Sequence, residues 1–191
     1  MIDEAKLEDQ GAGLVAAGQG WFVLNARDAR WFDSGAVHSL PLTGADEYEA
    51  ETFFPMLGLA LRVLEPGAAM SAYHWETEQE DFLVLAGTPL LVVEGQERQL
   101  RPWDFVHCPP GANHVFVGAG GGPSVVVAAS SRQFQKDGPW GEYTVDPVAA
   151  RHGASPPETT QDSELAGRDL PDRQPARYVD GWLERPFASV P

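Results

Sequence analysis

Residues 67–87 of this chain, GAAMSAYHWETEQEDFLVLAG, decide the fold. Three residues of metal-ligating types, His74, Glu76 and Glu80, stand between two glycines, and an apolar run follows the last carboxylate. Side chains alternate between the two faces of a strand, so His74 and Glu76 point to the same side. The polar residues 77–79 predict a bend that lets Glu80 reach the same point. The stretch therefore brings an imidazole and two carboxylates together.

A second stretch further along the chain, PPGANH at residues 109–114, supplies another histidine. Proline fixes φ and glycine permits a positive φ, so this segment predicts a rigid turn. His114 follows directly after the turn. We therefore expect its imidazole to be held in one place.

These residues resemble the two motifs of the cupin superfamily. The interval from Glu80 to Gly87 matches the first motif, and Pro109, Gly111 and His114 match the second. Both motifs stand in the order that cupins have. The resemblance implies an all-β fold, a cupin-type double-stranded β-helix or jelly-roll barrel, with N- and C-terminal extensions.

The resemblance covers only part of the chain, and two positions differ from the usual cupin motifs. It covers residues 55–130, which are expected to form the barrel, while 1–54 form an N-terminal extension with short strands and 131–191 a C-terminal extension and tail. Glu76 stands where cupins usually carry a second motif histidine. Trp103 stands where the second motif usually has glycine.

The resemblance implies that His74, Glu76, Glu80 and His114 bind a divalent transition metal. Two imidazoles and two carboxylates suit Fe, Mn, Zn, Ni or Cu, and the sequence does not choose among these ions. If Glu76 points away, the other three residues still form a set of two histidines and one carboxylate, as in non-haem iron oxygenases. The alternative is a hydrogen-bonded polar cluster without metal, which the resemblance to metal-free cupins allows.

Two residues are candidates for catalysis beside the metal. Glu76, if uncoordinated, or His107 could serve as the general base. His107 and Cys108 are adjacent on a predicted strand, so they face opposite ways and one of them faces the barrel interior. A buried cysteine usually behaves as a small apolar residue.

The residues expected to line the substrate pocket are largely apolar. Such a pocket suits a ring or a short acyl group. The leading hypothesis is a metal-dependent enzyme, an oxygenase, isomerase or lyase, acting on a small metabolite. The alternative is a cupin that binds or senses a small molecule without catalysis. The predicted pocket residues are Phe82, Val84, Trp103 and Phe105.

The remaining pattern agrees with a single β-rich domain. Short apolar segments separated by turn residues predict strands, and Gly95 predicts a hairpin. Residues 1–20 have no strong period and predict a short helix or a mobile lead-in, followed by a first strand at 21–24. The predicted barrel strands are 57–64, 82–85, 90–93, 99–100, 105–108, 114–117 and 124–128.

Some of these strands are apolar on both faces, so something must cover the outside of the barrel. The chain's own tails or a second subunit could do so, and the resemblance to cupins favours a homodimer. Aromatic residues return near the C-terminus in the segment RYVDGWLERPF, residues 177–187. We expect this segment to dock on the barrel or across a dimer.

Charge and cysteine content indicate which classes of partner and which cellular location to expect. The formal net charge of −15 repels phosphate backbones and anionic membranes, so nucleic acid and membrane partners are not expected. The single cysteine fits a reducing compartment, and no basic or apolar leader or long apolar stretch is present in the sequence. These features predict a cytoplasmic protein that binds a small molecule.

Overall fold

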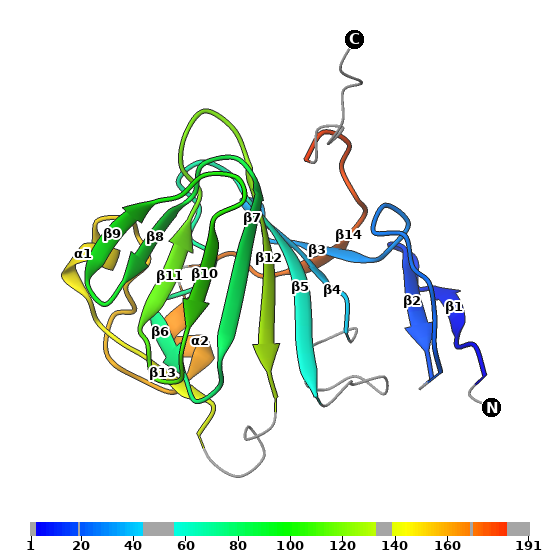
Figure 1. The fold of residues 1–191 in the computed structure, drawn as a ribbon, viewed down its shortest axis with the longest axis horizontal. Coiled ribbons are helices and arrows are strands. Elements are labelled where there is room, and N and C mark those ends of the chain that lie inside the picture. The colour runs from blue at the N-terminus through cyan, green and yellow to red at the C-terminus, as the bar shows by residue number, and fades with distance from the viewer. Residues whose placement is uncertain (1–2, 19, 44–55, 133–138, 169, 183–191) are drawn as a thin grey trace.

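The structure is a computed structural model that describes residues 3–18, 20–43, 56–132, 139–168 and 170–182. Two β-sheets face each other, and a short hairpin lies apart from them at one side (Figure 1). The arrangement is all-β, as the sequence predicts, with two facing layers of antiparallel strands as in a jelly-roll barrel.

Among the described residues the larger sheet has seven strands, and every neighbouring pair is antiparallel. Strands from both ends of the chain add to one side of it, while its opposite edge is a strand from the middle of the chain. In spatial order the strands are β10 (Phe105–Cys108), β7 (Glu80–Ala86), β12 (Ser124–Ser131), β5 (Leu57–Leu64), β4 (Val37–Pro41), β3 (Trp31–Asp33) and β14 (Gln174–Ala176).

The smaller sheet has five strands and is also antiparallel. It carries both histidine-bearing strands of the two motifs as direct neighbours. In spatial order its strands are β13 (Gly141–Tyr143), β6 (His74–Glu76), β11 (His114–Val117), β8 (Leu90–Val93) and β9 (Gln96–Gln99).

The main hydrophobic core lies between the two sheets. Val84 of β7 and Val126 of β12 are fully buried there, and they face Leu91 and Phe116 of the smaller sheet. Burying an aliphatic or aromatic side chain of this size contributes about 1.5–3 kcal/mol each. The core thus holds the two layers together and fixes which face of each strand looks inward.

The C-terminal extension covers the outer face of the smaller sheet. Helix α1 (Pro147–Ala150) begins after Asp146, whose carboxylate accepts hydrogen bonds from the backbone N–H groups of Val148 and Ala149. Ala149 is fully buried against the outward side chains of β8 and β11. A second short helix, α2 (Ser163–Gly167), follows in the same extension.

The last described residues cover part of the outer face of the larger sheet. Trp182 is 7% exposed and packs on Trp31, with ring centroids 4.9 Å apart. Both rings belong to a cluster with Val63 and Val125, which point outward from β5 and β12. The structure therefore places the chain's own tail on the barrel, while Phe187 of the predicted docking segment lies outside the described residues.

Most predicted barrel strands appear at or near their expected bounds. The hairpin between β8 and β9 turns at Glu94 and Gly95, which have φ angles of 48° and 68°. Positive φ at both central residues is the geometry of a type I′ turn, which glycine tolerates without strain. The prediction of a hairpin at Gly95 is confirmed.

The N-terminus differs from expectation. In place of a helix, β1 (Lys6–Asp9) and β2 (Leu14–Ala17) form an antiparallel hairpin. Gly11 and Gly13 both have positive φ and make the turn, which a sequence without clear alternation did not reveal. The strand predicted at 21–24 is also wrong, because only Trp21 makes an isolated bridge there.

None of the helices in the described parts of the chain is long and apolar enough to cross a membrane. The division into an extension, a barrel and a tail stays a prediction, although strands from both extensions join the larger sheet.

Candidate metal centre

The two motif histidines are cross-strand neighbours. His74 begins β6 and His114 begins β11, and the two residues are directly paired between these strands. Their ring centroids lie 5.0 Å apart. The backbone N–H of Gly111 donates to the carbonyl of Glu76 over 2.8 Å, so the turn before β11 is tied to β6. Gly111 has a φ of 85°, as expected for glycine in this rigid turn.

Both imidazoles are oriented by the backbone in the same way. Nδ1 of His74 lies 2.7 Å from the carbonyl oxygen of Ala72, and Nδ1 of His114 lies 3.0 Å from that of Ala112. A carbonyl oxygen only accepts, so each Nδ1 carries the proton that it donates. In the neutral ring this leaves the lone pair on Nε2, and histidines that bind metal are usually fixed by such a hydrogen bond.

Glu80 adds a carboxylate to the two imidazoles. It begins β7, and its Oε2 lies 3.2 Å from Nε2 of His114. One ligand atom from each of His74, Glu80 and His114 lies within 4.8 Å of the others. Both His114 and Glu80 are largely buried, with 3% and 13% of their side chains exposed.

The arrangement fits a divalent transition metal. Within the described parts of the chain, the buried Oε2 of Glu80 accepts no hydrogen bond of good geometry, although it points at His114. A buried carboxylate oxygen normally has a donor or a cation beside it. Two imidazole Nε2 atoms and a carboxylate oxygen form a donor set that Fe, Mn, Zn, Ni and Cu all accept.

The surroundings push the two histidine pKa values apart. Burial, with the neighbouring charge of His114, lowers the pKa of His74. Burial also acts to lower the pKa of His114, but the neighbouring Cys108 and Glu80, which favour the protonated imidazole, outweigh it and raise that pKa well above its usual range. These shifts favour the neutral form of His74 and the protonated form of His114.

Glu76, the fourth predicted ligand, lies beside the cluster. It follows His74 by two residues on β6, and its Oε1 lies 3.9 Å from Nε2 of His74. Its side chain is 15% exposed. The compact group of ligand atoms does not include Glu76, so its coordination stays a prediction.

A cavity of about 80 Å³ opens beside the cluster. Its wall contains Glu76 and Glu80 and two arginines, Arg62 and Arg132. Small residues of β5 and β12 complete it. The cavity is therefore polar, in contrast to the apolar pocket that the sequence suggested. Sequence reasoning missed both arginines. Arg62 carried a signal, because it is the single charge in the otherwise apolar segment LGLALRVL.

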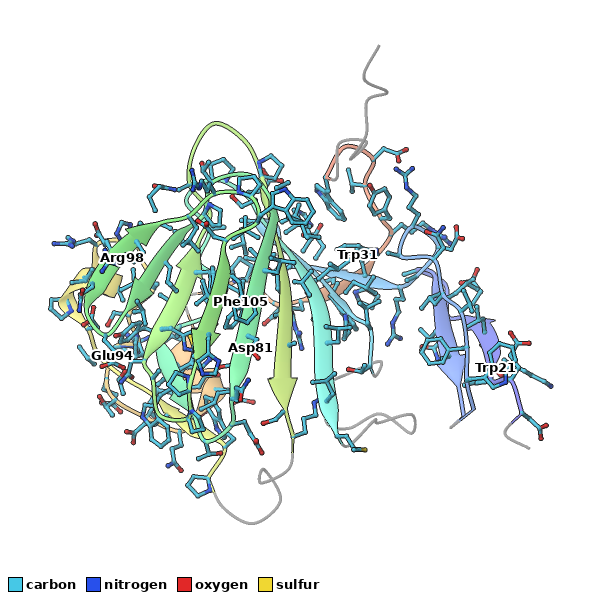
Figure 2. The ribbon with its side chains drawn as sticks, viewed as in Figure 1. Trp21, Trp31, Asp81, Glu94, Arg98 and Phe105 are labelled. Atoms are coloured by element: carbon cyan, nitrogen blue, oxygen red, sulfur yellow. The ribbon has the colours of Figure 1, made fainter. Side chains whose placement is uncertain are left out.

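The residues predicted to line the pocket lie elsewhere. Phe82 is buried in the core against the ring of His114, with ring centroids 5.4 Å apart, and Val84 is fully buried behind it. Trp103 and Phe105 are 76% and 64% exposed. Phe105 points away from the core on the edge strand β10 (Figure 2).

The structure does not bring His107 to the metal ligands. Cys108 is 2% exposed and belongs to the core, so alternation along β10 turns His107 outward. The His107 side chain is 49% exposed, and its Nδ1 lies 2.7 Å from Oδ1 of Asp81. The segment FVHC has apolar residues in both alternating positions, so the sequence alone left this choice open.

Part of the chain matches a known protein family. Residues 60–130 match the family model described as Cupin domain. A sugar phosphate isomerase from a cupin superfamily, from Silicibacter pomeroyi, is 29% identical; the match covers 52% of this chain and 62% of that one, with a TM-score of 0.44.

Two further solved structures are similar at lower identity. KdgF from Halomonas sp. is 19% identical, with coverage of 56% of this chain and 90% of that one and a TM-score of 0.45. A cupin 2 domain-containing protein from Halorhodospira halophila is 18% identical, with coverage of 64% and 80% and a TM-score of 0.49. No curated protein sequence matches the chain.

Proposed function

Because residues 60–130 match the Cupin domain family model, we propose that this protein is a metal-dependent enzyme acting on a small metabolite. His74, Glu80 and His114 would hold a divalent transition-metal ion. The observation that carries the proposal is the convergence of two oriented imidazoles and one carboxylate within 4.8 Å. Catalytic metal sites commonly use three protein ligands, whereas structural zinc sites are closed by four.

The ion would act as a Lewis acid toward an oxygen atom of the substrate. The residues of the chain would supply the remaining functions. Carbonyl groups of Ala72 and Ala112 keep both Nε2 atoms directed at one point. Phe82 closes the core side of the cluster and keeps water from that direction.

Glu76 is the proposed general base. It lines the cavity, stands 3.9 Å from Nε2 of His74, and lies outside the compact ligand group. A carboxylate in this position can take a proton from a substrate carbon or hydroxyl group. Such a base favours an isomerase or lyase over an oxygenase. His107 lies on the outer face and loses its role in this proposal.

The test is metal content, measured by inductively coupled plasma mass spectrometry on protein purified without a histidine tag. We expect about one equivalent of a transition metal, as one three-ligand site implies, and loss of that metal in His74→Ala and His114→Ala. His107→Ala is the matched control, because this histidine is exposed and is not one of the clustered ligand residues. A protein that stays metal-free after reconstitution would instead support a cupin that binds its ligand without catalysis.

Assembly and location remain predictions. The expected homodimer is tested by sedimentation velocity of the purified chain, and the expected cytoplasmic location by cell fractionation.

A further inference from the structure

We infer that Trp140, which lies in the C-terminal extension, recognises a ring of the substrate beside the proposed metal centre. The flat face of an indole stacks on an aromatic ring and also packs against the C–H groups of a sugar ring, so both kinds of ring share the required chemistry. The inference rests on the proposed function, because it assigns a substrate class and a specificity-determining residue to the same site.

Trp140 stands directly beside one of the proposed metal ligands. It precedes β13, the edge strand of the smaller sheet, and its ring centroid lies 5.9 Å from that of His74. Its carbonyl oxygen accepts hydrogen bonds from the backbone N–H and the hydroxyl group of Thr77, over 2.8 Å and 3.1 Å. The backbone of Trp140 is therefore fixed, and its indole ring is close to any substrate atom that binds next to His74.

The indole ring of Trp140 is not packed into the core. Its side chain is half-buried, whereas the core rings of Phe82 and Phe116 are 3% and 1% exposed. It contacts the rings of His74 and Tyr143 at angles of 53° and 62°, so neither ring lies parallel to it. Within the described parts of the chain its Nε1–H group donates no hydrogen bond. A half-buried tryptophan with an unused donor is typical of a binding surface.

Trp140 lies just beyond the wall of the cavity. Glu76 lines the cavity and is paired with Gly141 between β6 and β13, and Trp140 is the residue next to Gly141. The cavity has about 80 Å³, whereas pockets for drug-sized ligands have roughly 300–1,000 Å³. Only a few atoms of a substrate can enter it. The rest of the substrate must therefore extend beyond the wall, and past Glu76 it would meet the indole ring.

A purely supporting role of Trp140 predicts a different result from ring recognition. If the contact with His74 served only to orient the imidazole, removal of the indole would disturb the metal and weaken every ligand of that metal by the same factor. If the indole binds a ring, its removal weakens only those ligands that carry a ring. Two ligands with the same metal-binding group, one with a ring and one without, therefore separate the two roles.

The test is isothermal titration calorimetry with three probes: acetohydroxamate, benzohydroxamate and cyclohexanecarbohydroxamate. All three bind transition metals through the same two oxygen atoms, and they differ only in the methyl group, aromatic ring or saturated ring beside them. The metal-containing protein is titrated after its metal content has been measured. We expect at least one ring probe to bind about 10-fold more tightly than acetohydroxamate, as stacking on an aromatic side chain implies. The tighter ring probe separates an aromatic ring from a sugar-like ring.

The role of the indole is tested by Trp140→Ala and Trp140→Phe. Trp140→Ala should abolish the preference for the ring probe, a change of about 10-fold, and leave the affinity for acetohydroxamate unchanged. Trp140→Phe keeps a flat ring and should keep most of the preference. Trp21→Ala is the matched control, because Trp21 is 53% exposed and lies near the N-terminal hairpin, away from the smaller sheet (Figure 2). If Trp140→Ala does not fold, Trp140→Leu removes the flat face and keeps apolar volume.

Metal content is measured for every variant, so that the two proposals fail separately. Equal affinity of the wild type for all three probes, an undiminished ring preference in Trp140→Ala, or an equal loss for every probe in that variant overturns ring recognition and keeps the metal site. A wild type that stays metal-free after reconstitution overturns the metal-dependent function. Ring recognition is then tested with benzamide and acetamide by saturation-transfer nuclear magnetic resonance: binding of benzamide that requires Trp140 keeps it, and no such binding overturns it.

Discussion

Replacing Trp182 with alanine should destabilise the whole protein, because this side chain fixes the C-terminal segment to the larger sheet. Trp182 is 7% exposed. Its ring centroid lies 4.9 Å from that of Trp31 and 4.5 Å from that of His38. A buried tryptophan removes about 200 Å² from water. At about 25 cal/mol per Å² this gives an upper limit of roughly 5 kcal/mol.

The expected loss is smaller than this limit. Trp182 belongs to the last described segment, so the segment can detach locally and the loss cannot exceed its docking free energy. We therefore expect the free energy of unfolding to fall by about 3 kcal/mol, the lower end for buried aromatic residues. For a chain of this length the melting temperature should fall by about 6–12 °C.

Urea unfolding followed by far-ultraviolet circular dichroism measures this change without relying on tryptophan fluorescence. Trp103→Ala is the matched control, because Trp103 is 76% exposed and its removal should change stability by less than about 0.5 kcal/mol. Equal stability of Trp182→Ala and the wild type would refute the docking of the tail. Removal of residues 176–191 should cost at least as much as the single substitution.

Two further predictions concern the metal centre. Glu76→Gln should keep the wild-type metal content, since Glu76 lies outside the compact ligand group; a sharp loss of metal, measured by mass spectrometry, would make it a fourth ligand. The amount of metal that the protein retains should also depend on pH. Burial lowers the pKa of His114, but Cys108 and Glu80 raise it well above the usual range. Protons should therefore displace the metal as the pH falls through that raised pKa, and dialysis over a pH series would show whether metal content instead stays constant.

The strands with clear turn signals could be predicted because their limits are set locally. The segment 57–64 forms β5 with its expected bounds and ends before a turn in which Gly67 has a φ of 84°. Trp103, which stands where cupins usually have glycine, has a φ of 76°. Trp103 therefore adopts a backbone conformation that glycine tolerates best, at a cost in strain.

The cluster of candidate metal ligands could be predicted for a different reason. The two motifs place ligand types at strand starts, and pairing of β6 with β11 brings His74 and His114 together. The arginines required tertiary information. Arg132 follows a strand end with no special pattern, and its burial depends on the space above Gly58.

The C-terminal extension contributes to the site as well as to stability. Strand β6 carries His74, yet among the described residues it is paired with β11 only between His74 and His114. Its other neighbour is β13, which pairs with all three of its residues. The rings of Trp140 and Tyr143 lie 5.9 Å and 5.6 Å from that of His74.

Residues beyond the segment that matches the cupin family therefore hold one of the proposed metal ligands in place. Gly141 allows this close approach, because a Cβ atom there would collide with the carbonyl oxygen of Trp75. A barrel cut after residue 130 would keep all three ligand residues but would leave β6 with a single cross-strand pair. One cross-strand pair and the hydrogen bond from Gly111 to Glu76 would hold such a short strand only weakly. We therefore expect the proposed metal binding to require the C-terminal extension as well as the two motifs.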